Sequence, residues 1–308
     1  MVKQHGASAP RVAIVTGAGT GLGRAYALRL AADGMRVIVN NRRREVGADG
    51  RGSADRVVAE IAATGGEAVA SYEDVTAAGA GERMLAQALD TWGRLDALVN
   101  NAGVDQHAPF HRIDLQDFRR IFEVNFFGTV EVTHPVWRHM REAGHGRLVV
   151  STSAAGLHGL HGLTSYAASK AALIALARSL AAEGGSRDVF CNAIAPFAAT
   201  RMTAAHSREG DGSEHLPPEL VAPLVSALVR ADCRINGEVL VAGGGLARRT
   251  ATVECEPLLD CSAIAATDAS AQRLFKPVRI EGSCREFRDA LDAYADFRQR
   301  VVGGLRQP

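Results

Sequence analysis

The chain has 308 residues, of which 22% are charged and 47% are hydrophobic, and its formal net charge is +1. This composition is typical of a globular protein and gives no electrostatic reason to expect nucleic acid or an anionic membrane as a partner. The five cysteines are scattered without zinc-ligand spacing, and the chain shows neither a signal-peptide pattern nor an apolar run of about 18 residues, so we expect a cytoplasmic protein with reduced thiols, no metal site and no membrane span.

Short apolar runs alternate with helical patterns along most of the chain. The first run, Arg11–Thr16, is rich in β-branched residues and is followed at once by a glycine-rich turn and an amphipathic stretch. Similar patterns predict strands over residues 36–40, 68–72, 95–100, 147–151, 189–196 and 238–245, and helices over 53–64, 115–143, 166–185 and 218–230, with one more helix ending near Trp92. Because each crossover is long enough to join parallel strands, we predict an α/β fold with a Rossmann-type, doubly wound, seven-stranded parallel sheet flanked by helices.

The last part of the chain does not continue this alternation. We therefore predict one main domain over residues 10–246 and a C-terminal extension over residues 247–308. Ser283 and Glu286 form a capping-box pair, and the apolar residues that follow fall on one helical stripe, namely Phe287, Leu291, Tyr294 and Phe297. The extension should end in an amphipathic helix that packs either on its own subunit or on a partner subunit.

The stretch Ser151–Lys170 carries three side chains that can polarise a carbonyl group together. Tyr166 and Lys170 are four residues apart, so a helix would place them on one face, and Ser153 follows an apolar strand upstream. A nearby ammonium group can lower the phenol pKa from about 10 by roughly one to three units, which would make proton transfer reversible nearer neutral pH. Ser151 and Thr152 are the alternatives to Ser153, which we prefer for its spacing to Tyr166.

Glycines punctuate the turn after the first strand, which reads TGAGTGLG. Glycine tolerates positive φ and lets backbone N–H groups approach a pyrophosphate at a helix N-terminus, where the helix dipole favours anions. Gly17, Gly21 and Gly23 are spaced G-x-x-x-G-x-G, and Leu22 stands where the common dinucleotide pattern G-x-G-x-x-G has its third glycine. Alone, this turn is weak evidence for a dinucleotide site.

Four motifs in the same order make the chain resemble the short-chain dehydrogenase/reductase family from Val12 to Gly245. They are TGAGTGLG, the run NNAG at residues 100–103, Asn125 in a helix, and Ser153 followed by YAASK at residues 166–170. The resemblance implies an NAD(P)(H)-dependent oxidoreductase that interconverts a ketone and a secondary alcohol. It implies catalytic roles for Asn125, Ser153, Tyr166 and Lys170. It implies cofactor-binding roles for Gly17, Thr20, Gly21, Leu22, Gly23, Asn41, Arg42, Asp74, Val75, Asn101, Ala102, Gly103, Tyr166, Lys170, Pro196 and Thr200.

The segments between these motifs, such as CNAIAPFAATRMT, are similar to the 3-hydroxyacyl-CoA (17β-hydroxysteroid) dehydrogenase domains of peroxisomal multifunctional enzymes, which implies a 3-hydroxyacyl-CoA-like substrate. Where those domains carry an aspartate that binds the ribose of NAD, this chain has Asn41 followed by Arg42, Arg43 and Arg44. Loss of the carboxylate and gain of a guanidinium favour NADP(H), with NAD(H) possible. Asn125 stands where those domains have a histidine, and it restores the tetrad of the wider family.

The resemblance also implies a division of labour during reduction. Tyr166 would protonate the developing alkoxide, Ser153 would hold the substrate oxygen, and Asn125 would link Lys170 through water to a supply of protons. His107, His111, His158 and His161 would border the substrate pocket or lie in exposed loops rather than bind a metal. The polar segment over residues 204–215 stands where the family has a mobile substrate lid.

Other functions remain compatible with the sequence. The enzyme could reduce a bulky polyketide or steroid ketone, or the chain could be a dinucleotide-sensing regulator that keeps the fold without the chemistry. Sugar-nucleotide epimerase or dehydratase activity is a third possibility, less favoured by the glycine spacing. The apolar helix after Lys170 is the surface through which the family usually pairs, so we expect a homodimer or homotetramer that acts on a small-molecule ketone or alcohol.

Overall fold

Eight strands form one sheet in the order β3-β2-β1-β4-β5-β6-β7-β8 in a computed structural model, which describes residues 9–42, 46–47, 50–200, 215–255, 284–287 and 296. The strands of this sheet are β1 (Val12–Val15), β2 (Arg36–Asn40), β3 (Ala68–Ser71), β4 (Ala97–Asn100), β5 (Gly146–Ser151), β6 (Val189–Pro196), β7 (Val239–Gly243) and β8 (Leu246–Thr250). All the pairings from β3 across to β7 are parallel. The predicted doubly wound parallel sheet is therefore confirmed.

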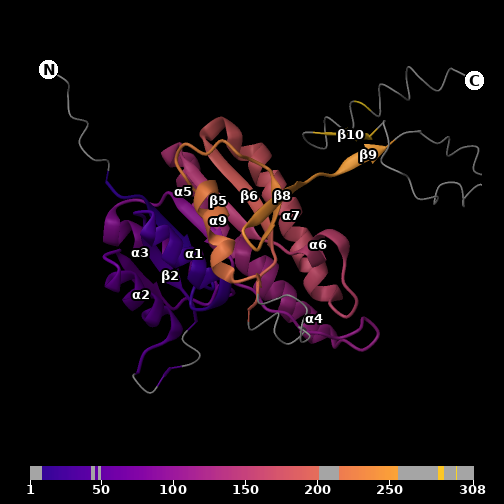
Figure 1. Ribbon diagram of the computed structural model, residues 1–308, viewed down its shortest axis with the longest axis horizontal. Helices are drawn as coiled ribbons and strands as arrows, with labels where there is room; N and C mark the ends of the chain where they lie inside the picture. The colour runs from indigo at the N-terminus through magenta and orange to yellow at the C-terminus, as the bar shows by residue number, and fades with distance from the viewer. Residues whose placement is uncertain are drawn as a thin grey trace, which may run out of the picture. The chain divides into compact units, whose positions relative to one another are not determined.

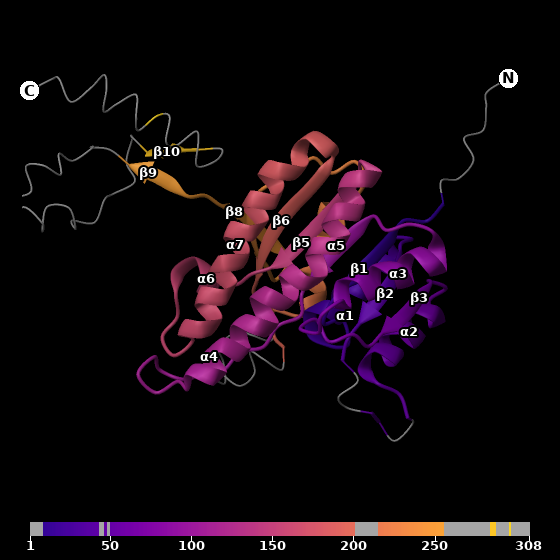
Figure 2. The same ribbon diagram turned by 180° about the vertical axis from the view of Figure 1, so that it is seen from behind.

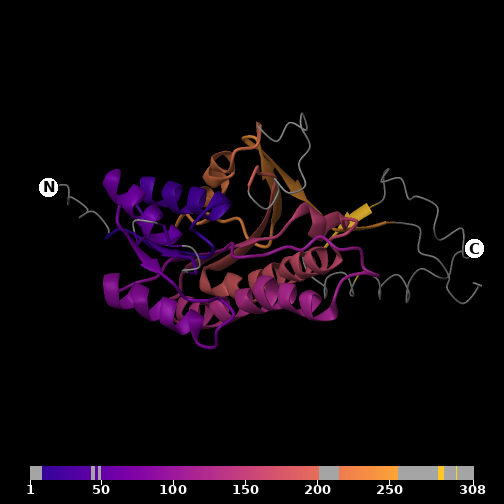
Figure 3. The same cartoon turned by 90° about the horizontal axis from the view of Figure 1, so that it is seen from below.

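Helices cover both faces of the sheet, which Figure 3 shows as two layers with the sheet between them. One hydrophobic cluster joins the sheet to α1 (Gly21–Ala32), α2 (Ser53–Ala63) and α9 (Ala222–Leu228). The other joins it to α3 (Ala80–Trp92), α5 (Gly128–Ala143) and α7 (Thr164–Gly184). Every residue of β1 and β4 is buried, as expected for central parallel strands that are covered on both faces.

Strand β8 is an addition to the seven predicted strands. It follows β7 after only Gly244 and Gly245, and both glycines have positive φ, at +57° and +79°. A two-residue connection joins antiparallel strands, and positive φ at both positions is what a type I′ turn requires. The pattern EVLVAGGG marked the end of β7, but the exposed residues of β8 lack the apolar run that a sequence prediction needs.

The strand order reverses between β1 and β4 at the centre of the sheet. From β1 the chain proceeds outward through β2 to β3, and it then returns to β4 on the other side of β1. Figure 2 labels β1, β2 and β3 in this outward order, and Figure 1 shows the same sheet from the opposite side. Connections that leave in opposite directions open a crevice at the carboxyl ends of the strands, where ligands of doubly wound folds bind. The residues that follow β1, β2, β4, β5 and β6 meet at this edge.

Four local features differ from the predicted secondary structure. The long helical region divides into α4 (Leu115–Phe122), a π-helical turn η1 (Glu123–Phe127) and α5, and Asn125 is completely buried within η1. Such a turn inserts an extra residue and often marks a functional position. The segment between Ser153 and Tyr166, for which no helix was predicted, contains a short helix, α6 (Ala154–His158). The predicted helix over residues 218–230 begins with a 3-10 turn, η4 (Pro218–Leu220), which precedes α9. A second 3-10 turn, η2 (Gly185–Arg187), follows α7.

The chain divides into two units, Met1–Arg249 and Thr250–Pro308. In the second unit β9 (Val253–Cys255) pairs antiparallel with β10 (Cys284–Glu286). Glu286 thus lies in a strand and not in the first turn of a helix, so the predicted capping box is wrong at this residue. Ser283, Leu291, Tyr294 and Phe297 lie outside the described residues, as do Arg43, Arg44 and residues 204–214 of the predicted lid.

Candidate active site

The glycine turn after β1 packs so tightly that side chains are excluded from it. A Cβ atom at Gly23 would lie 2.2 Å from the Gly17 carbonyl oxygen, and one at Gly17 would lie 2.8 Å from the Ala102 Cα atom. Gly17 also has φ of +63°, which favours glycine. The side chain of Thr20 makes no capping hydrogen bond at the start of α1, so the first N–H groups of this 12-residue helix are available to an anion.

The run NNAG after β4 holds this turn in place. The buried Thr16 hydroxyl accepts hydrogen bonds from the backbone N–H groups of Asn101 at 3.0 Å and of Ala102 at 3.1 Å. In return, the Asn101 amide donates to the carbonyl oxygens of Thr16 and Gly17 at 3.2 and 3.3 Å. These reciprocal bonds tie the ends of β1 and β4 together at the point where the strand order reverses.

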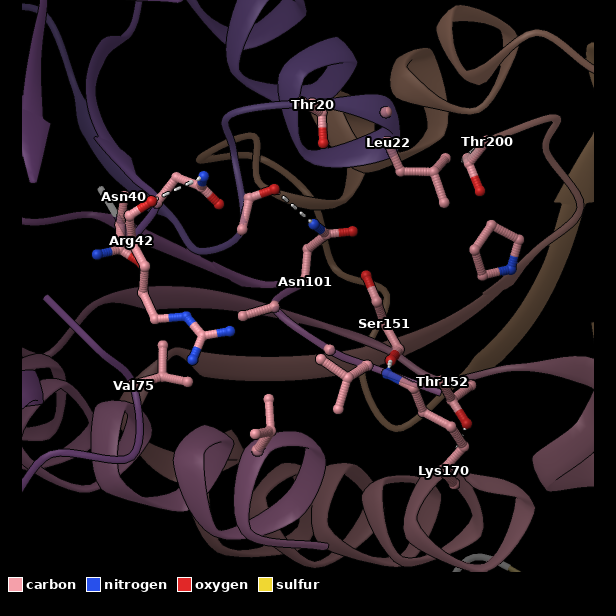
Figure 4. A pocket seen from close by; sticks show the side chains of 18 of the residues that line it. Thr20, Leu22, Asn40, Arg42, Val75, Asn101, Ser151, Thr152, Lys170 and Thr200 are labelled. Atoms are coloured by element: carbon pink, nitrogen blue, oxygen red, sulfur yellow. Dashed lines mark hydrogen bonds between the residues drawn. The ribbon is translucent and has the colours of Figure 1, made fainter. Parts of the chain in front are cut away.

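A cavity of about 320 Å³ opens beside the turn (Figure 4). Fourteen of the predicted cofactor-binding residues line it, namely Gly17, Thr20, Gly21, Leu22, Asn41, Arg42, Val75, Asn101, Ala102, Gly103, Tyr166, Lys170, Pro196 and Thr200. Gly23 and Asp74 are not in its lining, and neither are Ser153 and Asn125. Six further residues line the cavity. Two of them, Ser151 and Thr152, were the alternatives to Ser153, and the other four were not predicted, namely Asn40, Glu73, Val104 and Val124. Each of these four directly neighbours a predicted residue, and this adjacency was the available signal.

Lys170 reaches the cavity from inside α7 and is 4% exposed. Its ammonium group donates a 2.7 Å hydrogen bond to the Ser151 carbonyl oxygen, which Figure 4 marks as a dashed line. Burial lowers the pKa of Lys170 to about 8, because a buried ammonium loses its hydration. The Thr152 hydroxyl donates at 2.6 Å to the Lys170 carbonyl oxygen, so this alternative to Ser153 is already engaged in holding α7 on β5.

Tyr166 lies one helical turn before Lys170, with the Lys170 Nζ atom 5.7 Å from the centre of its ring. Burial raises the pKa of the Tyr166 phenol, a hydrogen bond with Ser153 opposes this shift, and the charge of Asp105 reinforces it. The expectation that Lys170 would lower this pKa is wrong for the described structure, because desolvation of the phenolate outweighs the other effects. At neutral pH the phenol therefore keeps its proton.

Ser153 occupies the position preferred in the sequence analysis. It is the N-cap of α6, where its hydroxyl oxygen accepts a 3.1 Å hydrogen bond from the Ala155 N–H. Capping holds the hydroxyl in one orientation, and the same hydroxyl interacts with Tyr166. Ser151 is also buried and lines the cavity, so it remains the alternative to Ser153 as the residue that holds the substrate oxygen.

Asn125 is placed behind the two catalytic candidates on α7. Its amide donates to the Val104 carbonyl oxygen at 2.9 Å and to the Ser169 hydroxyl at 3.0 Å, while its own oxygen accepts from the Val104 N–H at 2.8 Å. A Cβ atom at Gly103 would lie 3.2 Å from the Asn125 oxygen and 3.3 Å from the Lys170 ammonium. Asn125 thus fixes the backbone wall that separates it from Lys170.

At the opposite end of the cavity, Arg42 and Asn41 follow β2. The Arg42 guanidinium lies 3.1 Å from the Asp74 carboxylate, and Figure 4 shows it on the same side of the cavity as Val75. Burial opposes ionisation of Asp74, but hydrogen bonds from Thr76 and Arg42 outweigh it and leave the pKa of Asp74 below its ordinary value. The Asn41 amide donates to the Ser53 hydroxyl at 2.6 Å, so a neutral side chain stands where an aspartate would bring charge.

The histidines form no metal cluster among the residues that the structure describes. A Cβ atom at Gly162 would lie 2.4 Å from the His107 ring, and the Ala108 N–H donates to the Gly162 carbonyl oxygen at 2.8 Å. His107 therefore helps to join the loop after β4 to the loop before α7. Within the described ranges, no helix is long and apolar enough to span a bilayer.

The chain belongs to the short-chain dehydrogenase family, since residues 11–211 match the sequence profile of that family, described as short chain dehydrogenase. It is thus an oxidoreductase that acts on CH–OH groups, as the family resemblance implied. Mouse peroxisomal multifunctional enzyme type 2 is 45% identical over 237 residues, which cover 76% of this chain and 32% of the mouse protein, so the chain spans only about a third of that relative.

Solved structures give the same assignment. The fold is similar to that of a short chain dehydrogenase from Mycobacterium avium, with a TM-score of 0.74 and 37% sequence identity. The matched region spans 86% of this chain and 92% of the Mycobacterium avium chain. A 3-oxoacyl (acyl-carrier-protein) reductase from Agrobacterium tumefaciens C58, solved with NADP bound, has a TM-score of 0.68 at 29% identity and covers 77% of this chain and 94% of its own.

Proposed function

We propose that this protein is an NADP(H)-dependent oxidoreductase that interconverts a 3-oxoacyl thioester and a 3-hydroxyacyl thioester, with Tyr166 as the general acid and base. The observation that carries the proposal is a single cavity whose lining includes both the glycine turn and the pair Tyr166 and Lys170. One site can thus hold a dinucleotide and exchange a proton.

The residues of the cavity fit a dinucleotide. Glycine at positions 17 and 23 lets the turn pack directly against the run NNAG, and the uncapped start of α1 offers N–H donors to a pyrophosphate. Gly21 and Leu22 would border the pyrophosphate, and Val75 and Asp74 would border the adenine. Pro196 and Thr200 would border the nicotinamide. The bound nicotinamide supplies the hydride.

The protein's own task is to deliver and remove the proton at the substrate oxygen. Because burial keeps the Tyr166 phenol neutral, its hydroxyl is ready to donate a proton to the alkoxide that forms when the carbonyl is reduced. Ser153 holds the same oxygen by a hydrogen bond. Lys170 then stabilises the tyrosinate from its buried position, and Asn125 keeps the intervening backbone in place.

The preference for NADP(H) depends on the side chains after β2. Asn41 brings no negative charge that would repel a 2′-phosphate, and Arg42 presents a guanidinium at the rim of the cavity. We expect kcat/KM for NADPH to exceed that for NADH, and Asn41→Asp to reverse the preference. Equal or better use of NADH by the unaltered enzyme would contradict this assignment.

The thioester assignment is supported by the motif-linking segments that resemble 3-hydroxyacyl-CoA dehydrogenase domains and by the structural likeness to a 3-oxoacyl reductase. Turnover should be tested with purified protein, NADPH and a panel containing an acetoacetyl thioester, a steroid ketone and a polyketide-like diketone. We expect the thioester to give the highest kcat/KM. Cofactor binding without turnover of any ketone would instead indicate a dinucleotide-sensing regulator. A homodimer or homotetramer in the cytoplasm stays a prediction.

A further inference from the structure

Tyr26 is a buried titratable side chain that the proposed mechanism leaves unused. It lies in the second turn of α1, is completely buried, and does not line the catalytic cavity. Burial raises the pKa of its phenol, and the neighbouring Ser151 hydroxyl opposes this rise. The phenol therefore keeps its proton at neutral pH and can donate a hydrogen bond.

Ser151 ends β5 and is approached from both faces of the sheet. Its carbonyl oxygen accepts the 2.7 Å hydrogen bond from Lys170 of α7. Its side chain lies on the opposite face, because side chains alternate along a strand and Val149, on the same face as Ser151, packs in the cluster that contains α1. Figure 4 accordingly shows the Ser151 side chain pointing away from Lys170. The serine thus stands between the helix that follows the glycine turn and the helix that carries Lys170.

The hydroxyl groups of Tyr26 and Ser151 are neighbours that are both buried without a hydrogen bond. Neither oxygen has a partner at ordinary length and angle in the part of the chain that the structure describes. Buried hydroxyls lose their hydration, so proteins generally satisfy them with a ligand or a bound water. Because Ser151 lines the catalytic cavity and Tyr26 does not, a ligand in the cavity would meet the serine hydroxyl first.

The position of Ser151 in the sheet selects the nicotinamide end of a dinucleotide. Ser151 pairs with Ile194 of β6, two residues before Pro196, which would border the nicotinamide. The adenosine end would lie near Arg42, which follows β2, and β1 and β4 separate β2 from β5. Hydroxyl groups are uncharged and can donate and accept, so they suit the ribose hydroxyls and the carboxamide of the nicotinamide riboside.

We infer that Tyr26 is a positioning residue for the cofactor, whose phenol donates to the Ser151 oxygen while the Ser151 hydroxyl donates to an oxygen of the nicotinamide riboside. The pair joins α1 to the end of β5, whose carbonyl oxygen holds Lys170, and so fixes the nicotinamide relative to the proton-transfer pair. The Ser153 hydroxyl interacts with Tyr166 instead, so the two serines have different tasks. The inference rests on the dinucleotide site of the proposed function and not on its thioester substrate.

The test measures, by calorimetry, the affinities for NADP⁺ and for adenosine 2′,5′-bisphosphate, a fragment without the nicotinamide riboside. Tyr26→Phe and Ser151→Ala should each weaken NADP⁺ binding by about fivefold, as expected for loss of one neutral hydrogen bond, and leave binding of the fragment unchanged. In the double variant the two losses should not add, because Tyr26 acts through Ser151. The control is Ser165→Ala, which removes a hydroxyl that is likewise buried without a partner among the described residues but lies outside the cavity; neither affinity should change.

Stability without ligand is a second readout. Because no described group pairs with the Tyr26 hydroxyl, Tyr26→Phe should not lower the midpoint of urea unfolding. A lower midpoint together with equal weakening of both ligands would show that Tyr26 only holds α1 in the core, and this would overturn the inference. Unchanged NADP⁺ affinity in Tyr26→Phe and Ser151→Ala would overturn it as well, since a bound water would then satisfy both hydroxyls.

The ligand 2′-phospho-ADP-ribose keeps the ribose and lacks the nicotinamide ring, so it separates the two candidate acceptors. A loss of its affinity equal to that of NADP⁺ would assign the contact to the ribose, and no loss would assign it to the carboxamide; both results support the inference. If the unaltered protein binds NAD⁺ more tightly, NAD⁺ and ADP replace the first two ligands, and only the preference for NADP(H) is refuted. The expected affinity changes in a protein that reduces no ketone would refute only the proposed function.

Discussion

Two buried cations at opposite edges of the same sheet have different surroundings. Arg147 lies at the start of β5 and is completely buried, while Lys170 lies beside the end of β5 and is 4% exposed. Arg147 is paired with a carboxylate, and Lys170 is held by one backbone carbonyl oxygen. A buried cation that is paired with a carboxylate holds neighbouring elements together, whereas a buried cation without a carboxylate partner stays available to exchange a proton.

The surroundings of Arg147 satisfy most of its donors. Its guanidinium binds the carbonyl oxygens of Gly146, Asp188 and Ala231 and the Asp188 carboxylate, and it lies 4.3 Å from the centre of the Phe190 ring. His145 also contacts Asp188, at 2.7 Å. Burial raises the pKa of Asp188, but hydrogen bonds from His145 and Arg147 outweigh it and leave that pKa below its ordinary value.

The surroundings of Lys170 do not compensate for the hydration that its ammonium group loses on burial. The only cause that shifts its pKa is burial, which lowers it from 10.5 to about 8. No carboxylate forms an ion pair with Lys170 in the part of the chain that the structure describes. We therefore propose that the amino-terminal ends of the strands hold a stabilising ion pair and that their carboxyl-terminal ends hold a proton-transfer pair, and the following predictions test this division.

The largest expected effect is at the carboxyl-terminal edge. Tyr166→Phe should lower kcat by at least about 10²-fold, because it removes the proton donor while leaving the ring and the fold in place. The measurement is steady-state ketone reduction together with NADPH binding, which should be unchanged. Tyr72→Phe is the matched control, since Tyr72 is an exposed tyrosine that does not line the catalytic cavity. Retention of activity in Tyr166→Phe would refute the mechanism.

At the amino-terminal edge, loss of the carboxylate should affect stability instead. Asp188→Asn should lower the free energy of unfolding by about 3 kcal/mol, the lower end of the range for breaking a buried pair, because Asp188 is partly exposed. Asparagine tolerates the left-handed backbone at φ of 52°, so backbone strain is not added. Urea unfolding measures the change. Asp232→Asn, in an exposed pair with Arg230, should leave the midpoint unchanged.

A smaller effect follows from the depressed pKa of Lys170. The folded protein releases this proton near pH 8, whereas the unfolded chain keeps it until about pH 10.5, so the unfolded state binds more protons between these values and stability rises with pH there. The rise should be at most about 3 kcal/mol and absent below about pH 7. It is measured as the difference in free energy of unfolding between the unaltered protein and Lys170→Met. A flat difference from pH 7 to 10 would show that Lys170 is not desolvated.

The same comparison predicts the stability of Lys170→Met itself. Because no buried carboxylate is left unpaired, the variant should unfold at neutral pH within about 1 kcal/mol of the unaltered protein while losing most of its reductase activity. Thermal unfolding and a single-substrate assay suffice. Destabilisation similar to that in Asp188→Asn would show that Lys170 has a structural role like that of Arg147.

The amino-acid sequence was sufficient to predict the parallel sheet, the order of its elements from β1 to β7 and the residues grouped around the glycine turn and the YAASK motif. These are local signals, since apolar runs mark buried strands and the spacing of Tyr166 and Lys170 fixes their common helix face. Asn125 could be named from its motif, but its contacts with Val104 and Ser169 arise from the packing of η1 on α7.

Which charged side chains are buried and which are accessible could not be read from the sequence, because this depends on how the elements pack. Arg147 and Arg42 are both arginines next to a strand end, and nothing in the neighbouring residues distinguishes the buried cation from the one that lines the cavity. The pKa of Tyr166 is raised and not lowered for the same reason, because desolvation depends on every element packed around the phenol. Burial is a property of the whole fold, and so the sequence located the reacting groups while the fold set their protonation.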